Sequence, residues 1–182
     1  WVDKIGKGVD IKLGALVKTS GVNTSPAADA KWQLKFWFYD TLNALIGGVP
    51  FALDVDQTVA TRDWFADTNA VGSVILPKDA YKLQISAEAG LNATGTVWFD
   101  DFIFVGRGGA WAGHNWNGFV DADSGWQYWI APEGGNDGRS YFPGSGVTTE
   151  AARTGSYSLK VAALPGRPSG ELVWFTETVP IP

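Results

Sequence analysis

The sequence predicts an all-β fold, a sandwich or a barrel, on three observations. Aromatic residues make up 14% of the 182 residues and include 10 Trp, and aromatic side chains are enriched in strands. The chain also contains 23 Gly and 9 Pro, which supply many turns. Several segments alternate apolar and polar residues, whereas no long segment has the apolar period of a helix. The 45% hydrophobic content is enough for a sizeable core.

Six strands are expected in the first part of the chain, residues 1–105. Residues 9–19 alternate, with Leu13, Ala15 and Val17 on the apolar face. Residues 31–40 alternate more clearly: even-numbered positions are apolar, and odd-numbered positions, which include Trp37 and Tyr39, are aromatic or polar. We expect this second face to look outward. The other strands are expected at residues 49–58, 71–76, 81–87 and 96–105.

Residues 106–118 form a Gly- and Trp-rich seam without a hydrophobic period, which predicts a connector between residues 1–105 and 119–182. Beyond the seam, residues 131–146 are predicted to be a surface loop. Strands are expected near residues 126–130, 156–163 and 171–179. This strand set is too small for an independent sandwich. Residues 119–182 are therefore expected to need the first part or a neighbouring chain.

The composition excludes several classes of function. A net charge of -5 without clustered Lys or Arg argues against a nucleic-acid partner. The sequence has no apolar run long enough for a membrane span, and the lack of Cys excludes disulfides and thiol chemistry. The chain begins at Trp1 and contains no Met, so we expect a processed piece of a longer precursor. A processed chain suits a secreted protein at an extracellular or cell-surface location, although the lack of Cys fits a cytosolic protein equally well.

Three segments resemble a known family. Residues 147–161 (VTTEAARTGSYSLKV) carry the most specific likeness, and residues 117–126 and 95–105 carry shorter ones. They resemble the carbohydrate-binding modules appended to xylanases and glucanases, which form a jelly-roll β-sandwich family. The resemblance implies a jelly-roll-like β-sandwich. In the family, the motif similar to residues 118–161 opens the module and the motif similar to residues 96–105 closes it, whereas the order here is reversed.

The reversed order implies a split or permuted module, with its second half in residues 1–105 and its first half in residues 119–182. Three arrangements fit: a permuted monomer whose termini meet, a slice of a tandem array, or a polymer subunit whose strands are exchanged between neighbouring chains. The favoured hypothesis is a non-catalytic, extracellular structural subunit or repeat unit. It would assemble end to end with copies of itself, as a filament, tube or array, by strand complementation.

The alternative hypothesis is a glycan-binding module. Trp37 and Tyr39 share their face with Gln33 and Lys35, and a pyranose ring can stack on an aromatic side chain while its hydroxyls bind flanking polar groups. A polysaccharide is the partner in this case. The same face could instead be buried against a second sheet or another subunit. A third hypothesis is an accessory domain of a large hydrolase.

The resemblance also implies a structural calcium ion. It would be held by Asp100 or Asp101 together with an acidic residue of the opening motif, where Val120 replaces the usual Glu and leaves Asp121 or Asp123 as substitutes. Carboxylates and carbonyls supply the about six to eight oxygens that calcium needs. Adjacent strand positions predict that the Asp100 and Asp101 side chains point to opposite faces, which excludes a catalytic carboxylate pair.

Two seam residues, Trp111 and Trp116, are expected to be buried where modules meet. His114 is the only His and has no partner motif for a zinc site or a catalytic triad. No catalytic residue is predicted, and an enzyme is not expected.

Overall fold

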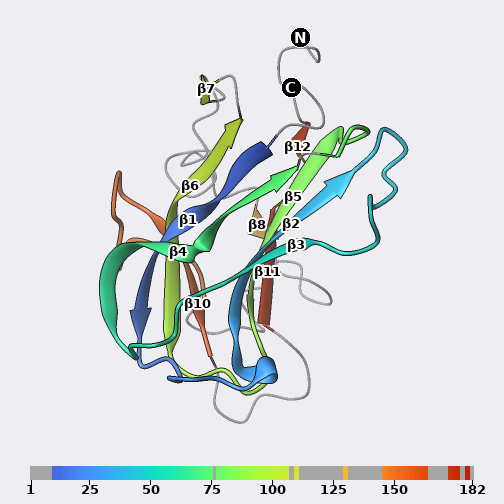
Figure 1. The fold of residues 1–182 in the computed structure, drawn as a ribbon. Helices are drawn as coiled ribbons and strands as arrows, with labels where there is room; N and C mark the ends of the chain where they lie inside the picture. The colour runs from blue at the N-terminus through green and yellow to red at the C-terminus, as the bar shows by residue number, and fades with distance from the viewer. Residues whose placement is uncertain are drawn as a thin grey trace.

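A computed structural model describes residues 10–75, 77–106, 109–110, 129–130, 145–163, 172–176 and 179–180. Within these residues the chain forms two antiparallel sheets that pack face to face, so the predicted all-β sandwich is confirmed (Figure 1). Sheet A has the strand order β4-β1-β6-β10-β9, with β7 paired to β6. Sheet B has the order β3-β2-β5-β11-β8, with β12 paired to β5.

The element bounds are as follows. Sheet A contains β1 (Asp10–Ser20), β4 (Arg62–Ile75), β6 (Thr96–Gly106), β7 (Gly109–Ala110), β9 (Gly146–Thr148) and β10 (Ser158–Ala162). Sheet B contains β2 (Trp32–Tyr39), β3 (Phe51–Asp54), β5 (Lys82–Ala89), β8 (Trp129–Ile130), β11 (Leu172–Thr176) and β12 (Val179–Pro180). A 3-10 helix, η2 (Ala28–Ala30), precedes β2.

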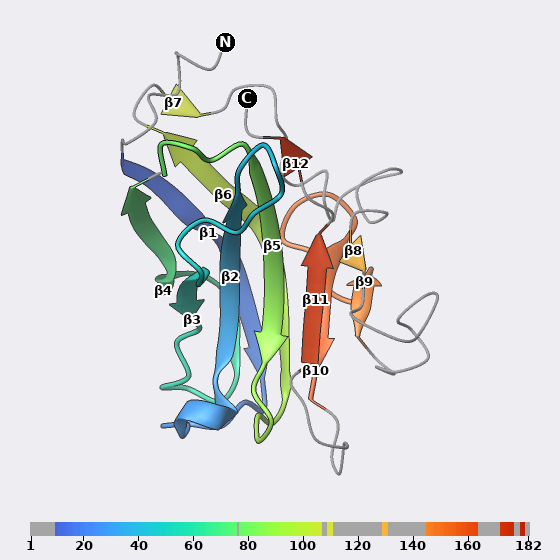
Figure 2. The same cartoon turned by 90° about the vertical axis from the view of Figure 1, so that its right-hand side faces the viewer.

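The core lies between the sheets, which Figure 2 shows with β2 and β5 in front of β1 and β6, and β11 in front of β10. Alternate residues of each strand point into it, because successive side chains of a strand point to opposite faces. From sheet A the buried side chains are Leu13, Ala15, Val17, Val97, Phe99, Leu159 and Val161. From sheet B they are Trp32, Leu34, Phe36, Phe38, Leu53, Leu83, Ile85, Ala87 and Ala89. The predicted apolar faces of β1 and β2 are therefore confirmed.

Two predicted strand boundaries are wrong. β3 ends at Asp54 rather than at residue 58, because the Asp56 side chain accepts a hydrogen bond from the Thr58 N–H (2.9 Å) and forms a local turn that competes with the ladder. β4 begins at Arg62 rather than at residue 71. Its pairing with β1 contains register shifts, and such irregularities obscure the alternation from which a strand is predicted.

Strands from both predicted halves share each sheet within one chain. β10 pairs with β6, where Leu159 lies opposite Phe99, and β11 pairs with β5. Neither residues 1–105 nor residues 119–182 form a complete sheet alone. β9 was not expected. It begins at Gly146, the last residue of the surface loop predicted at residues 131–146, and continues to Thr148. Among the described segments, none is a helix of the length and apolarity that a membrane span requires.

Candidate functional site

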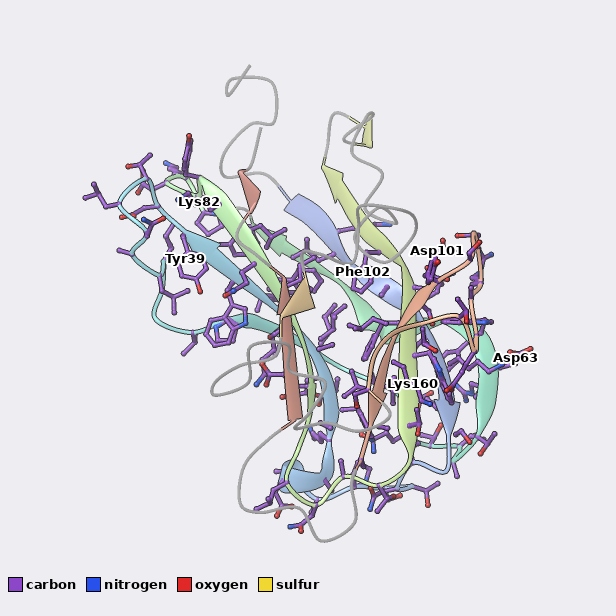
Figure 3. The ribbon with its side chains drawn as sticks, turned by 180° about the vertical axis from the view of Figure 1, so that it is seen from behind. Tyr39, Asp63, Lys82, Asp101, Phe102 and Lys160 are labelled. Carbon is purple, nitrogen blue, oxygen red and sulfur yellow. The ribbon has the colours of Figure 1, made fainter. Side chains whose placement is uncertain are left out.

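The outward face of β2 carries the four side chains that the sequence singled out. Gln33, Lys35, Trp37 and Tyr39 alternate with fully buried residues, and each is half-buried. The structure therefore brings these four together in one row along the strand, on the outer face of sheet B. Figure 3 shows Tyr39 and Lys82 on this side of the sandwich, whereas Lys160 and Asp63 lie on the opposite side.

Three side chains of this row, those of Lys35, Trp37 and Tyr39, reach diagonally to β5. Trp37 Nε1 donates a hydrogen bond to Ser86 Oγ (2.9 Å), and the Tyr39 hydroxyl donates to Gln84 Oε1 (3.0 Å). In the backbone register, however, Trp37 lies opposite Gln84. The bonds thus run to the diagonal neighbour, which long and aromatic side chains can reach across an antiparallel pair. The polar ends of both aromatic residues are held in place before any ligand arrives.

Lys35 follows the same diagonal pattern and forms an ion pair with Glu88. The carboxylate of Glu88 is almost completely buried. Its other oxygen, Oε1, accepts a hydrogen bond from Ser86 Oγ (2.7 Å). The charge of Lys35, which was predicted to face a glycan, is therefore engaged by Glu88.

Asp54 of β3 borders the row on the other side of β2. Its carboxylate accepts hydrogen bonds from Gln33 Nε2 (2.7 Å) and from Lys31 Nζ. Partial burial acts to raise the pKa of Asp54, but the hydrogen bonds from Lys31 and Gln33 and the charges of Lys31 and Lys35 outweigh it, so the pKa is lowered. Asp54 therefore stays ionised at neutral pH. Burial raises the pKa of Tyr39, which keeps its hydroxyl protonated and able to donate.

Four residues of this face were not found from the sequence: Asp54, Gln84, Ser86 and Glu88. Asp54, Gln84 and Ser86 occupy alternate positions of predicted strands, and polar residues in that pattern indicate a polar face, whereas Glu88 lies just past the predicted strand 81–87. Their pairing with β2 could not be deduced, since register depends on long-range strand pairing.

The outward face of sheet A differs from this row. Its Trp98 is also half-buried, and lies in register between Lys18 of β1 and Lys160 of β10. The Lys160 ammonium lies 5.8 Å from the centroid of the Trp98 ring, within cation–π range. Lys160 therefore covers part of the Trp98 ring face on which a sugar would otherwise stack.

Asp100 and Asp101 both contact the segment before β10, so the prediction that they point to opposite faces is wrong. Between the paired positions Gly14↔Ile103 and Leu16↔Asp100, one residue of β1 opposes two residues of β6. This is a β-bulge, and it places Asp101 in the left-handed region with φ 47°. An aspartate tolerates that conformation better than most residues. The bulge redirects the second carboxylate toward the same loop as the first.

The two carboxylates bind Arg153 and Thr154. Asp100 accepts hydrogen bonds from both backbone N–H groups (2.7 Å and 3.3 Å), and Asp101 accepts from the Arg153 guanidinium and the Thr154 hydroxyl. Their oxygens suit a cation, but Arg153 already supplies positive charge beside Asp101. A calcium ion bound here would compete with that guanidinium.

The remaining predicted residues, Asp121, Asp123, Trp111 and Trp116, lie outside the described part of the chain. Inside it, no group of three or more His, Cys, Asp or Glu side chains is arranged to hold a metal ion. The calcium ligand set and the burial of the seam remain predictions.

Comparison with known proteins adds no assignment, since no family model, no curated protein and no solved structure matches this chain. The resemblance of three of its segments to carbohydrate-binding modules accordingly remains a hypothesis drawn from their residues.

Proposed function

We propose that this chain is a non-catalytic glycan-binding module that uses the outward face of β2. The observation that carries the proposal is the pair Trp37 and Tyr39, which lie two positions apart on one face with their polar atoms held by β5. Aromatic side chains on one face, flanked by polar groups, match the chemistry of a pyranose ring. An extracellular location would give this face access to polysaccharides.

A bound sugar would contact both apolar and polar groups of this face. The Trp37 ring would take the C–H face of a sugar, while amide groups such as that of Gln33 would exchange hydrogen bonds with its hydroxyls. Asp54 has a lowered pKa, so it is poorly suited to act as the general acid of a glycosidase, and its ionised carboxylate would instead accept hydrogen bonds from sugar hydroxyls.

A pull-down on insoluble xylan, glucan and cellulose tests the proposal. We expect the wild type to bind at least one of them and Trp37→Ala to bind about tenfold more weakly, through loss of the stacking surface. Trp98→Ala is the matched control, because it removes a half-buried outward Trp from the other sheet. Wild-type binding by Trp37→Ala, or no binding to any of the three, would overturn the proposal.

We propose end-to-end assembly as a second function, on a separate observation. Within the described chain, the exposed large apolar side chains lie in or next to the connections at the two ends of the sandwich. Leu42, Val49, Ile75 and Tyr81 are at the end where β2 finishes, and Val59 and Leu91 are at the other end. Unlike surfaces at opposite ends suit a head-to-tail contact between copies of the chain.

Sedimentation velocity over a wide range of protein concentration tests assembly. We expect polymers that grow with concentration, and a smaller polymer for Leu42→Ser, because the Leu42 side chain is 84% exposed and its loss leaves the core intact. Thr41→Ala, at the exposed neighbouring position, is the control. A monomer at every concentration would exclude this function.

A further inference from the structure

Trp37 is connected to a buried carboxylate by an ordered chain of hydrogen bonds. Its indole N–H donates to Ser86 Oγ at 2.9 Å, Ser86 Oγ donates to Glu88 Oε1 at 2.7 Å, and Glu88 Oε2 accepts from Lys35. Ser86 is 0% exposed and Glu88 is 4% exposed. Water is therefore a poor substitute for any of these partners.

The donor and acceptor properties of the four side chains fix the direction of each hydrogen bond in this series. An indole nitrogen can only donate, so Ser86 must use a lone pair to accept from it. The single Ser86 proton is then available for the Glu88 carboxylate, which can only accept when ionised. Lys35 supplies the opposite charge that a buried carboxylate requires. Reversing or breaking one bond would leave a buried group without a partner, which is costly.

We propose that Ser86 and Glu88 are positioning residues for Trp37, and that Lys35 acts on the glycan only through Glu88. This inference rests on the proposed glycan-binding function of the β2 face. The hydrogen-bond chain holds the indole plane in one orientation before the sugar arrives. Ordering a side chain in advance removes an entropy cost that would otherwise reduce affinity by about twofold to tenfold.

Ser86→Ala is the decisive variant, because it removes one hydroxyl and separates Trp37 from Glu88. Two quantities are measured: the position and solvent exchange of the Trp37 indole N–H resonance, which Trp37→Phe identifies, and the dissociation constants for soluble xylan and glucan oligosaccharides. We expect the resonance to move, its exchange to accelerate and the affinity to fall about twofold to tenfold. Glu88→Gln should move the resonance too, since a neutral amide can turn either its oxygen or its nitrogen toward Ser86.

Ser158→Ala provides the matched control. Ser158 is also a fully buried serine, but it lies in β10 of sheet A and donates to the Ala151 carbonyl. We expect this variant to lose stability without changing the Trp37 resonance or the affinity. Ser86→Thr, which keeps a hydroxyl, should restore both quantities toward wild type.

The outcomes separate the two proposals. An unchanged Trp37 resonance in Ser86→Ala would overturn the hydrogen-bond chain, and a moved resonance with unchanged affinity would overturn its positioning role. Wild-type affinity in Trp37→Ala would instead overturn the glycan-binding function of this face, and with it any role of Ser86 in positioning Trp37 for a sugar.

Discussion

The Asp100 carboxylate accepts a hydrogen bond from the backbone N–H of Arg153 at 2.7 Å, and this bond joins the two predicted halves of the module. Asp100 is completely buried in β6, and Arg153 precedes β10, the strand that pairs with β6. The same carboxylate also accepts from the backbone N–H groups of Thr154 (3.3 Å) and Asp101 (2.7 Å). One side chain thus satisfies three backbone donors at the junction of the halves.

Asp100→Asn should lower the free energy of unfolding by about 1–3 kcal/mol. Both oxygens of Asp100 accept hydrogen bonds, and the amide nitrogen of Asn cannot accept one, so buried N–H groups lose a partner. Urea unfolding at neutral pH measures the change. Asp63→Asn is the control, because Asp63 is highly exposed and its pair with Lys18 should matter little. An Asp100→Asn variant as stable as the wild type would contradict the prediction.

Comparing the wild type with Asp100→Asn at several pH values should show how protonation of Asp100 affects stability. Burial raises the pKa of Asp100, although hydrogen bonds from Arg153, Asp101 and Thr154 oppose the shift. The folded chain therefore binds this proton more tightly than the unfolded chain, so the Asp100 contribution to stability is present at low pH and is lost as the pH rises through the raised pKa. Asp54 and Asp56 have lowered pKa values, and their contributions are lost on acidification instead.

We therefore expect the stability of the wild type relative to Asp100→Asn to increase between neutral pH and about pH 4. Urea unfolding of both proteins across this range measures the difference at each pH. Asp54 and Asp56, whose pKa values are lowered, are present in both proteins, so their effect on the stability difference cancels. A difference that stays constant, or that shrinks on acidification, would show that the pKa of Asp100 is not raised.

Gly95→Ala should destabilise the fold by about 3 kcal/mol or more. Gly95 has φ 86°, and a Cβ there would lie 2.4 Å from the Ser20 carbonyl oxygen and from the Gly21 carbonyl carbon. Both are backbone atoms that cannot turn away. Gly47→Ala is the matched control: Gly47 has φ 78° but no heavy atom within 4 Å of the added Cβ, so only the backbone strain of about 1–2 kcal/mol is expected. Equal melting temperatures for the two variants would contradict the predicted close contact.

The calcium hypothesis predicts that added calcium raises the melting temperature of the wild type and that a chelator reverses the effect, because an ion bound only to the folded state stabilises it. Asp101→Asn should abolish the response. Asn also tolerates the left-handed conformation of Asp101, so this variant tests the charge rather than the backbone. A melting temperature that is independent of calcium in the wild type would dispose of the hypothesis.

The sequence alone predicted the all-β class and the outward row on β2. Both depend on the period of two between successive side chains, and that period is a local property of the chain. Leu34 and Phe36 face the core, and Trp37 and Tyr39 face outward, as their alternation indicated. The polar alternation of Gln84, Ser86 and Glu88 was equally visible in the sequence, but which strand it would meet was not.

Tertiary structure decided the pairings and their exceptions. The diagonal contact from Trp37 to Ser86 exists only because β2 and β5 pair in one register, and a shift of one residue would send every side chain to the other face. The bulge at Asp101 overrides the alternation that placed Asp100 and Asp101 on opposite faces. Alternation along one strand is encoded by that strand, whereas register and bulges depend on a partner strand that is distant in the sequence.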